Sequence, residues 1–316
     1  MSEQTERSRG SSKTENTRKS VLEQIRTGVS EYRFEYAMLL PTLLLLITIL
    51  WLPFLRGIWM SFHEWPFFGE KNWIGSGNYQ YLFQWSAFYT SLRVTFIYGL
   101  TVIGQLALAI AAALTLKHQT RFKDFLGSLL IIPYTLPSVV TGTIWIYILN
   151  PDFGPFFKFM EQLGTTNGPI YWSTVGSQAL AVISFVGIWS FWPFMFVIIY
   201  ASVENINEEY YESAKVYKAT RYQMFRNVTL PQIKSSILVA LIIRTIWNLS
   251  KVSQPLQMTG GGPSYETSLL AILLYNEAST NGNLGLSYSI GIILLIGTLA
   301  LIVVFVREFE QSTEEI

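Results

Sequence analysis

Six long apolar stretches limit what this chain can fold into more strongly than any other feature of its sequence. A helix needs roughly 20 mostly apolar residues to cross a bilayer core about 30 Å thick. Five stretches reach about that length without a charged residue, and they lie within residues 37–55, 94–116, 125–149, 170–203 and 286–306. The sixth, residues 235–254, is equally apolar except for Arg244 and Lys251. We therefore expect an all-α integral membrane protein with six transmembrane helices.

The composition supports this expectation and excludes several functions. Only 14% of the residues are charged, whereas a soluble protein usually has about a quarter. A net charge of +1 provides no basic field for nucleic acid. The chain has no cysteine, and its two histidines, His63 and His118, lie far apart. We therefore expect no catalytic cluster and no metal site.

The lysines and arginines predict the orientation of the spans. Sixteen of the 22 fall in the N-terminal tail, the second and fourth loops and the C-terminus, and only four fall in the alternate loops. The positive-inside rule places the richer side in the cytoplasm. We expect a multi-pass protein of the cytoplasmic membrane with both termini cytoplasmic. Residues 1–35 would form a polar, partly disordered tail, and residues 36–316 the transmembrane domain.

The cytoplasmic loop between the fourth and fifth spans, at about residues 204–234, predicts two short helices. Asn207 is a suitable N-cap because two glutamates follow it in the first turn. Thr220 and Gln223 have the spacing of a capping box, which would begin a second helix. Pro231 disfavours helical geometry in the residue before it. We expect a helix-turn-helix elbow that ends before the fifth span begins.

The same elbow contains a pattern of residues with family significance, namely E-x-A, then A, then F, and then L-P. The residues concerned are Glu212, Ser213, Ala214, Lys218, Ala219, Phe225, Leu230 and Pro231. This pattern resembles the EAA loop of the permease subunits of ABC importers. The resemblance implies that the elbow is a coupling helix that docks on an ATP-hydrolysing subunit, with Glu212 as a charged contact. Ser213 and Lys218 depart from the usual alanine and glycine.

Two further motifs extend the resemblance over most of the membrane part. Thr259 and the turn residues Gly260, Gly261, Gly262 and Pro263 match the T-x-G-G-P signature of carbohydrate-type permeases. Prolines 133 and 137 in the third span are also spaced as in that family. The chain resembles the first-permease group of maltose porters, which implies the type I importer permease fold. Three glycines before a proline predict a tight turn, and this turn is not a phosphate-binding loop because no Gly-Lys-Ser/Thr follows it.

The resemblance also implies a set of partners. These are a second homologous permease, two ATP-hydrolysing subunits that bind Mg-ATP, and an external solute-binding protein. The chain itself would hold no cofactor, would not be an enzyme, and would lie in the lipid bilayer.

Polar residues in the fifth span suggest a path for the solute. Arg244, Asn248 and Lys251 would share one helix face, with Trp247 beside it. Charged groups inside a membrane usually face a cavity or a partner. The stripe could bind the hydroxyls of a sugar and stack against its ring. Alternatively, Arg244 pairs with the partner permease and Lys251 extends to the membrane surface.

Span four would form the opposite wall of this path. Gly187, Ser190, Phe191 and Phe194 recur at three- or four-residue intervals, and the resemblance places them in a sugar-lining stretch. Aromatic stripes of this kind also occur where helices simply pack. Pro193 would loosen the helix locally.

These observations favour a permease subunit of an ATP-driven importer for a sugar or related polar solute. The alternative is a stand-alone ion-coupled carrier or channel, which would need carboxylates inside its spans and usually an internal repeat. No aspartate or glutamate falls within a span core. The sequence leaves open whether the solute is neutral, phosphorylated or acidic.

Overall fold

The computed structural model describes residues 32–118, 121–165 and 168–314, with side chains described as far as Arg307. The chain divides into two compact units, Met1–Trp59 and Met60–Ile316. The polar tail expected over residues 1–35 lies outside the described residues as far as residue 31.

One continuous apolar helical run covers the described part of the first unit and ends at Met60, the first residue of the second. It comprises α2 (Arg33–Leu46), the π-helical turn η1 (Ile47–Trp51) and α3 (Leu52–Met60). The run is 28 residues long and contains an 18-residue window with a mean hydropathy of 2.4. At 1.5 Å per residue it is about 42 Å long, which is enough to cross a bilayer. The first expected span is therefore present.

The second unit begins with a small antiparallel hairpin. In it β1 (His63–Glu64) pairs with β2 (Asn72–Trp73), and α4 (Gly77–Leu82) follows. The side-chain amide of Asn78 joins α4 to the hairpin region, since it donates to the backbone oxygens of Ser61 at 2.8 Å and His63 at 2.9 Å.

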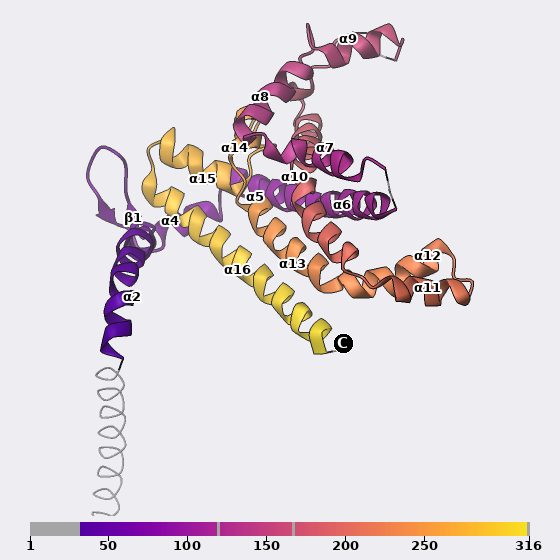
Figure 1. Cartoon of the computed structure of the whole chain (residues 1–316). Helices are drawn as coiled ribbons and strands as arrows, with labels where there is room; N and C mark the ends of the chain where they lie inside the picture. The colour runs from indigo at the N-terminus through magenta and orange to yellow at the C-terminus, as the bar shows by residue number, and fades with distance from the viewer. Residues whose placement is uncertain (1–31, 119–120, 166–167, 315–316) are drawn as a thin grey trace, which may run out of the picture. The chain divides into compact units, whose positions relative to one another are not determined.

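The rest of the second unit is helical (Figure 1). Its elements are α5 (Ser86–Gly99), α6 (Thr101–Lys117), α7 (Lys123–Thr135), α8 (Ser138–Ile148), α9 (Pro155–Gln162), the 3-10 turn η2 (Trp172–Thr174), α10 (Gly176–Glu204), α11 (Glu208–Val216), α12 (Arg221–Met224), the π-helical turn η3 (Phe225–Thr229), α13 (Leu230–Leu249), α14 (Ser253–Thr259), α15 (Leu270–Ser279) and α16 (Leu284–Glu314).

Among the described residues, five helical runs are long and apolar enough to cross a membrane, or six with one bent pair. The six expected spans are thus all represented, but the third is not one helix. Its halves, α7 and α8, meet at an angle of 93°. The cause is Pro137, because a proline pushes the preceding residue out of helical geometry, and Leu136 has an extended ψ of 132°.

The fifth span also differs from expectation at both ends. Its helical run starts at Arg221 and passes through Pro231 without interruption, so the predicted end of the elbow before this proline is wrong. The proline lies in the first turn of α13, where its missing N–H costs little. At the other end α13 stops at Leu249, and residues 250–252 are not helical before α14 begins.

Helix α10 forms the centre of the second unit. It packs against α6, α7 and α13, which surround it in Figure 1. Small side chains on α6, Ala109 and Ala113, are fully buried in the same cluster as Met195 and Ile199 of α10. Small residues allow helices to approach closely where hydrophobic burial offers little gain in lipid. Pro193 lies inside α10, which continues past it to Glu204.

Candidate functional site

The interruptions in the third and fifth spans lie at one cavity of about 580 Å³. We call it the break cavity. Its lining residues come from the α7–α8 break, the α13–α14 break, α10 and α13, and are Tyr134, Thr135, Leu136, Pro137, Ser138, Phe191, Arg244, Trp247, Ser250, Lys251, Val252 and Ser253. Non-helical backbone at membrane depth is tolerated only where protein buries it or where it lines a polar cavity. The two breaks therefore bring non-helical backbone and polar side chains to the wall of one cavity.

Aromatic rings form much of the lining. Tyr134, Phe191 and Trp247 face the cavity, and Phe194 packs behind them. The ring of Phe194 lies 4.8 Å from that of Trp247 and 6.0 Å from that of Tyr134, measured between centroids. Trp247 remains 42% exposed and Tyr134 39% exposed. The cavity therefore offers flat apolar faces next to hydroxyl groups, as a sugar ring requires.

Arg244 is the most deeply buried charged residue of the cavity, with 2% of its surface exposed. Its Nε donates a hydrogen bond to Oε1 of Gln105 on α6, at 2.8 Å. Its guanidinium carbon lies 4.3 Å from the centroid of the Phe191 ring. Its Nη2 is buried without a hydrogen-bond partner among the described residues. The guanidinium is thus held from one side and unsatisfied on another.

Lys251 is half-buried and links the two breaks directly. Its Nζ donates to Oγ of Ser138 at 3.0 Å and lies 4.0 Å from the centroid of the Phe191 ring. Within the described residues, neither Lys251 nor Arg244 has a carboxylate within 4.0 Å. The cavity therefore contains two cations that the described part of the chain does not neutralise.

The structure brings together four of the eight residues predicted for the solute path. Phe191, Arg244, Trp247 and Lys251 line the break cavity. The prediction that Arg244 and Lys251 share one helix face is wrong, because α13 ends at Leu249 before Lys251. Lys251 reaches the cavity from the break itself.

The other four predicted path residues do not line the cavity. Phe194 supports its aromatic wall from behind. Asn248 is fully buried and donates to Oγ1 of Thr101 at 3.2 Å. Ser190 donates to the backbone of its own helix, and Gly187 packs so closely on Tyr98 that an added Cβ would lie 2.6 Å from the phenol oxygen. Phe194, Asn248 and Gly187 thus pack helices against one another, whereas the Ser190 hydroxyl bonds only within α10.

Sequence reasoning missed Gln105, Tyr134 and Ser138. A signal existed for Gln105, which is a polar side chain in the middle of the apolar stretch 94–116. Tyr134 and Ser138 flank the break at Pro137, and they would follow from recognising that proline as an interruption.

The predicted elbow is present, with the predicted caps. Asn207 accepts a hydrogen bond from the backbone N–H of Glu209 at 3.1 Å and begins α11. Thr220 and Gln223 form the reciprocal capping box that begins α12. Between them Lys218 adopts a φ of 57°, in the left-handed region that glycine occupies most easily. Lysine thus accepts the backbone strain of the turn.

The eight predicted coupling residues divide by exposure. The exposed ones are Glu212, Ser213, Lys218 and Pro231, and the partly buried ones are Ala214, Ala219, Phe225 and Leu230. Three large apolar side chains also project from the elbow, with Val216 79%, Tyr217 85% and Tyr222 67% exposed. Exposed apolar groups beside charged ones are typical of a protein contact surface.

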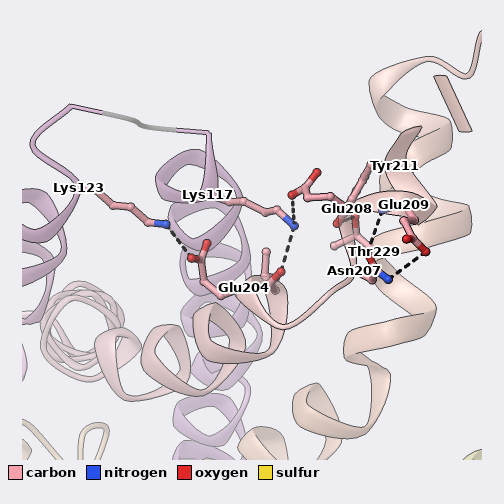
Figure 2. A network of polar contacts seen from close by, with 9 residues as sticks. Lys117, Lys123, Glu204, Asn207, Glu208, Glu209, Tyr211 and Thr229 are labelled. Carbon is pink, nitrogen blue, oxygen red and sulfur yellow. Dashed lines mark hydrogen bonds and ion pairs between the residues drawn. The ribbon is translucent and has the colours of Figure 1, made fainter. Parts of the chain in front are cut away.

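A polar network ties α11 to α6, α10 and η3 (Figure 2). Nζ of Lys117, at the end of α6, donates to the backbone oxygen of Val203 at 3.2 Å and lies 3.3 Å from a carboxylate oxygen of Glu208. The same nitrogen lies 4.3 Å from the centroid of the Tyr211 ring. The hydroxyl of Tyr211 lies 2.9 Å from that of Thr229 in η3. One lysine therefore joins three helices at the base of the elbow.

A second ion pair joins the start of α7 to the end of α10. Nζ of Lys123, the first residue of α7, lies 2.7 Å from a carboxylate oxygen of Glu204 at the end of α10. A further cavity of about 680 Å³ lies between α6, α11 and α12, and of the predicted coupling residues only Phe225 lines it. The ion pair thus links α7 to α10, and both helices also form walls of the break cavity.

The glycine motif forms the predicted tight turn. Gly260 and Gly261 have φ values of 63° and 94°. The Thr267 hydroxyl donates to the backbone oxygen of Gly262 at 2.6 Å. The turn connects α14 to α15, so it follows the interrupted end of the fifth span.

Comparison with known proteins gives one family. Residues 105–312 match the family described as "Binding-protein-dependent transport system inner membrane component". This range contains the elbow, the glycine turn and every lining residue of the break cavity.

Individual relatives agree with this match. The chain is 27% identical over 279 residues to the trehalose/maltose transport system permease protein MalF of Thermococcus litoralis, covering 88% of this chain and 94% of that protein. It is 29% identical over 276 residues to the sulfoquinovosyl glycerol transport system permease protein SmoG of Agrobacterium fabrum, covering 85% and 88%.

A solved structure shows the same fold. A chain from a bacterial ABC transporter involved in the import of the acidic polysaccharide alginate superimposes with a TM-score of 0.76 and 21% identity. The match covers 91% of this chain and 99% of that one.

Proposed function

This chain belongs to the family of inner membrane components of binding-protein-dependent transport systems, and on that premise we propose that it is a permease subunit that moves a saccharide across the cytoplasmic membrane. The observation that carries the proposal is the break cavity. Two interrupted spans, three aromatic faces and several hydroxyls converge on about 580 Å³. Stacking faces beside hydrogen-bonding groups are what a polyhydroxylated ring needs from its site.

Relatives support the saccharide class. Two of them, at 27% and 29% identity, are named as transporters of trehalose and maltose and of sulfoquinovosyl glycerol. An external binding protein delivers the saccharide to the permease. A solved complex of fold-related chains contains an alginate pentasaccharide-bound periplasmic protein, which supports such a partner.

We propose that the elbow receives force from an ATP-hydrolysing partner. Helix α11 and the exposed Val216, Tyr217 and Tyr222 dock on that partner, and Glu212 contributes a charged contact. Two such partners bind Mg-ATP, and this chain holds no nucleotide or other cofactor and catalyses no reaction itself. A second homologous permease completes the path. The positive-inside distribution supports cytoplasmic termini.

The contacts around Lys117 suggest how the force travels. Glu208, on the first turn of α11, meets Lys117 of α6, and Lys123 of α7 meets Glu204 of α10. Because α7 and α10 also line the break cavity, a shift of α11 reaches the cavity through rigid helices. Alternating access follows when ATP closure draws this elbow and that of the partner permease together.

Purification in a mild detergent tests the proposal. We expect this chain to co-purify with a second permease and with ATP-hydrolysing subunits, and saccharides presented with the binding protein to stimulate ATP hydrolysis. Uptake by the isolated chain driven by an ion gradient would instead support a stand-alone carrier.

A charge reversal tests the coupling role. Glu212→Lys should abolish saccharide-stimulated ATP hydrolysis or co-purification of the ATPase. Glu161→Lys, an exposed glutamate of α9 outside the elbow, is the matched control. Normal assembly and stimulation in the Glu212 variant would refute the assignment.

A further inference from the structure

The break cavity has an unbalanced charge. Arg244 and Lys251 both line it, and within the described residues no carboxylate lies within 4.0 Å of either. A buried cation without a counter-ion is costly at membrane depth. A negative charge from outside the described residues would offset this cost.

The helix ends at the cavity do not supply that charge. Helices α7 and α13 end there, which presents carbonyl groups, while α8 and α14 begin there, which presents N–H groups. These opposite partial charges offset one another. The net charge of the break cavity is consequently set by its side chains, and both of its charged side chains are positive.

The surroundings of Arg244 restrict how an anion can bind. Gln105 accepts the Nε–H, which fixes the guanidinium, and the ring of Phe191 lies against its face. Neither terminal nitrogen of the guanidinium has a hydrogen-bond partner within the described residues, and of the two Nη2 is buried. A fixed guanidinium edge is suited to a planar or tetrahedral oxyanion.

Lys251 provides the more accessible cation. It is half-buried and is held at the junction of the two breaks by Ser138. Phe191 lies within 4.3 Å of Arg244 and 4.0 Å of Lys251, so both cations contact the same ring. A benzene ring weakly attracts cations but cannot serve as a counter-ion.

From this arrangement we propose that the transported saccharide is acidic, and that Arg244 and Lys251 bind its carboxylate, sulfonate or phosphate group. Lys251 meets the acidic group first and the edge of Arg244 binds it deeper in the cavity. The inference rests on the proposed function, because it adds the charge of the saccharide to the class already given. The rival source of negative charge is a carboxylate of the partner permease.

The experiment uses the complete transporter with its binding protein in proteoliposomes. The probes are matched oligosaccharides that differ only at C6, namely glucuronate against glucose, galacturonate against galactose and mannuronate against mannose, together with 6-phosphate and 6-sulfonate forms. We expect an acidic member to be taken up at least tenfold faster than its neutral counterpart at limiting concentration.

Variants then locate the preference in the cavity. Lys251→Gln and Arg244→Gln should each lower the acidic-to-neutral uptake ratio at least tenfold, and Lys251→Arg should retain most of it. Lys158→Gln, an exposed lysine of α9, is the matched control and should not change the ratio. Because one binding protein serves every variant, a changed ratio reports on the permease. Lys251→Gln leaves the bond between Arg244 and Gln105 intact, so it tests the proposal even if Arg244→Gln fails to assemble.

Three results would overturn the inference. Preferred uptake of the neutral members would exclude an acidic saccharide while leaving the proposed function intact. An unchanged acidic-to-neutral uptake ratio in Lys251→Gln would show that the break cavity does not select the charge of the saccharide. Loss of the partner permease from purified Lys251→Gln would assign the cation to a subunit contact. If no saccharide of either charge is transported, the proposed function itself fails.

Discussion

We expect the hydrogen bond between Arg244 and Gln105 to contribute more to the free energy of unfolding than most polar contacts within the membrane part. Gln105 is fully buried, and its Oε1 accepts from the Nε of Arg244 at 2.8 Å. Gln105→Leu keeps a similar volume but removes the acceptor, which leaves Nε of Arg244 unpaired in addition to the buried Nη2. Bonds to charged groups contribute about 1.5–3 kcal/mol, whereas neutral interhelical bonds in membranes average about 0.6 kcal/mol.

We therefore expect Gln105→Leu to destabilise the chain by about 2 kcal/mol. The two bonds donated by the Gln105 amide add little to this figure, because both are 3.4 Å long. About 2 kcal/mol corresponds to a roughly 30-fold change in the unfolding equilibrium. The measurement is reversible unfolding in mixed detergent micelles with increasing SDS, followed by the loss of helical circular dichroism.

Ser190→Ala is the matched control for this measurement. Ser190 is equally buried, but its hydroxyl donates only to the backbone of its own helix, at Val186. Its removal should cost no more than about 0.6 kcal/mol. If both variants lose the same stability, Arg244 does not depend on Gln105 and the reasoning about the fixed guanidinium is wrong.

Three other predictions concern Lys117, Lys218 and Glu277. Lys117→Met should lower saccharide-stimulated ATP hydrolysis severalfold, because it removes the contacts to Glu208 and to α10, and normal stimulation would exclude this route for the force. Lys218→Gly should stabilise the elbow by up to about 1 kcal/mol, since glycine accepts the φ of 57° more easily, and limited proteolysis of the loop measures it. Burial raises the pKa of Glu277 in α15, so the folded state holds this proton more tightly than the unfolded state. The thermal midpoint should then fall as the pH rises from about 4.3 through the raised pKa, and Glu277→Gln, which is always neutral, should reduce that slope.

The features that the sequence predicted well are those that local chemistry decides. An uncharged stretch has no other stable location than lipid or a core, so the spans were evident. Asn207 and the pair of Thr220 and Gln223 satisfy backbone groups within a few residues, and the elbow caps follow from that spacing. The effect of Pro137 is equally local, and it was overlooked because the apolar run continues through it.

The parts that the sequence did not predict depend on distant contacts. The cost of burying a charge singled out Arg244 and Lys251, but nothing in the chain order pairs Arg244 with Gln105, 139 residues away. The end of α13 at Leu249 also lacks a local glycine or proline, so the helix face assigned to Lys251 continued too far. The sequence likewise does not distinguish a lining residue such as Phe191 from a packing residue such as Ser190 one position earlier.

The two helix breaks have a consequence for hydration. Backbone amides inside an uninterrupted span are protected from deuterium exchange by both helical bonding and lipid. Residues 136–138 and 250–252 fall where helical bonding stops beside a polar cavity, and a hydroxyl and an ammonium group bridge them. A deuterium uptake map should therefore show early labelling between α7 and α8 in the third span and between α13 and α14 at the end of the fifth, flanked on both sides by slowly exchanging helix. The solvent path would then be visible as two short gaps in an otherwise protected membrane domain.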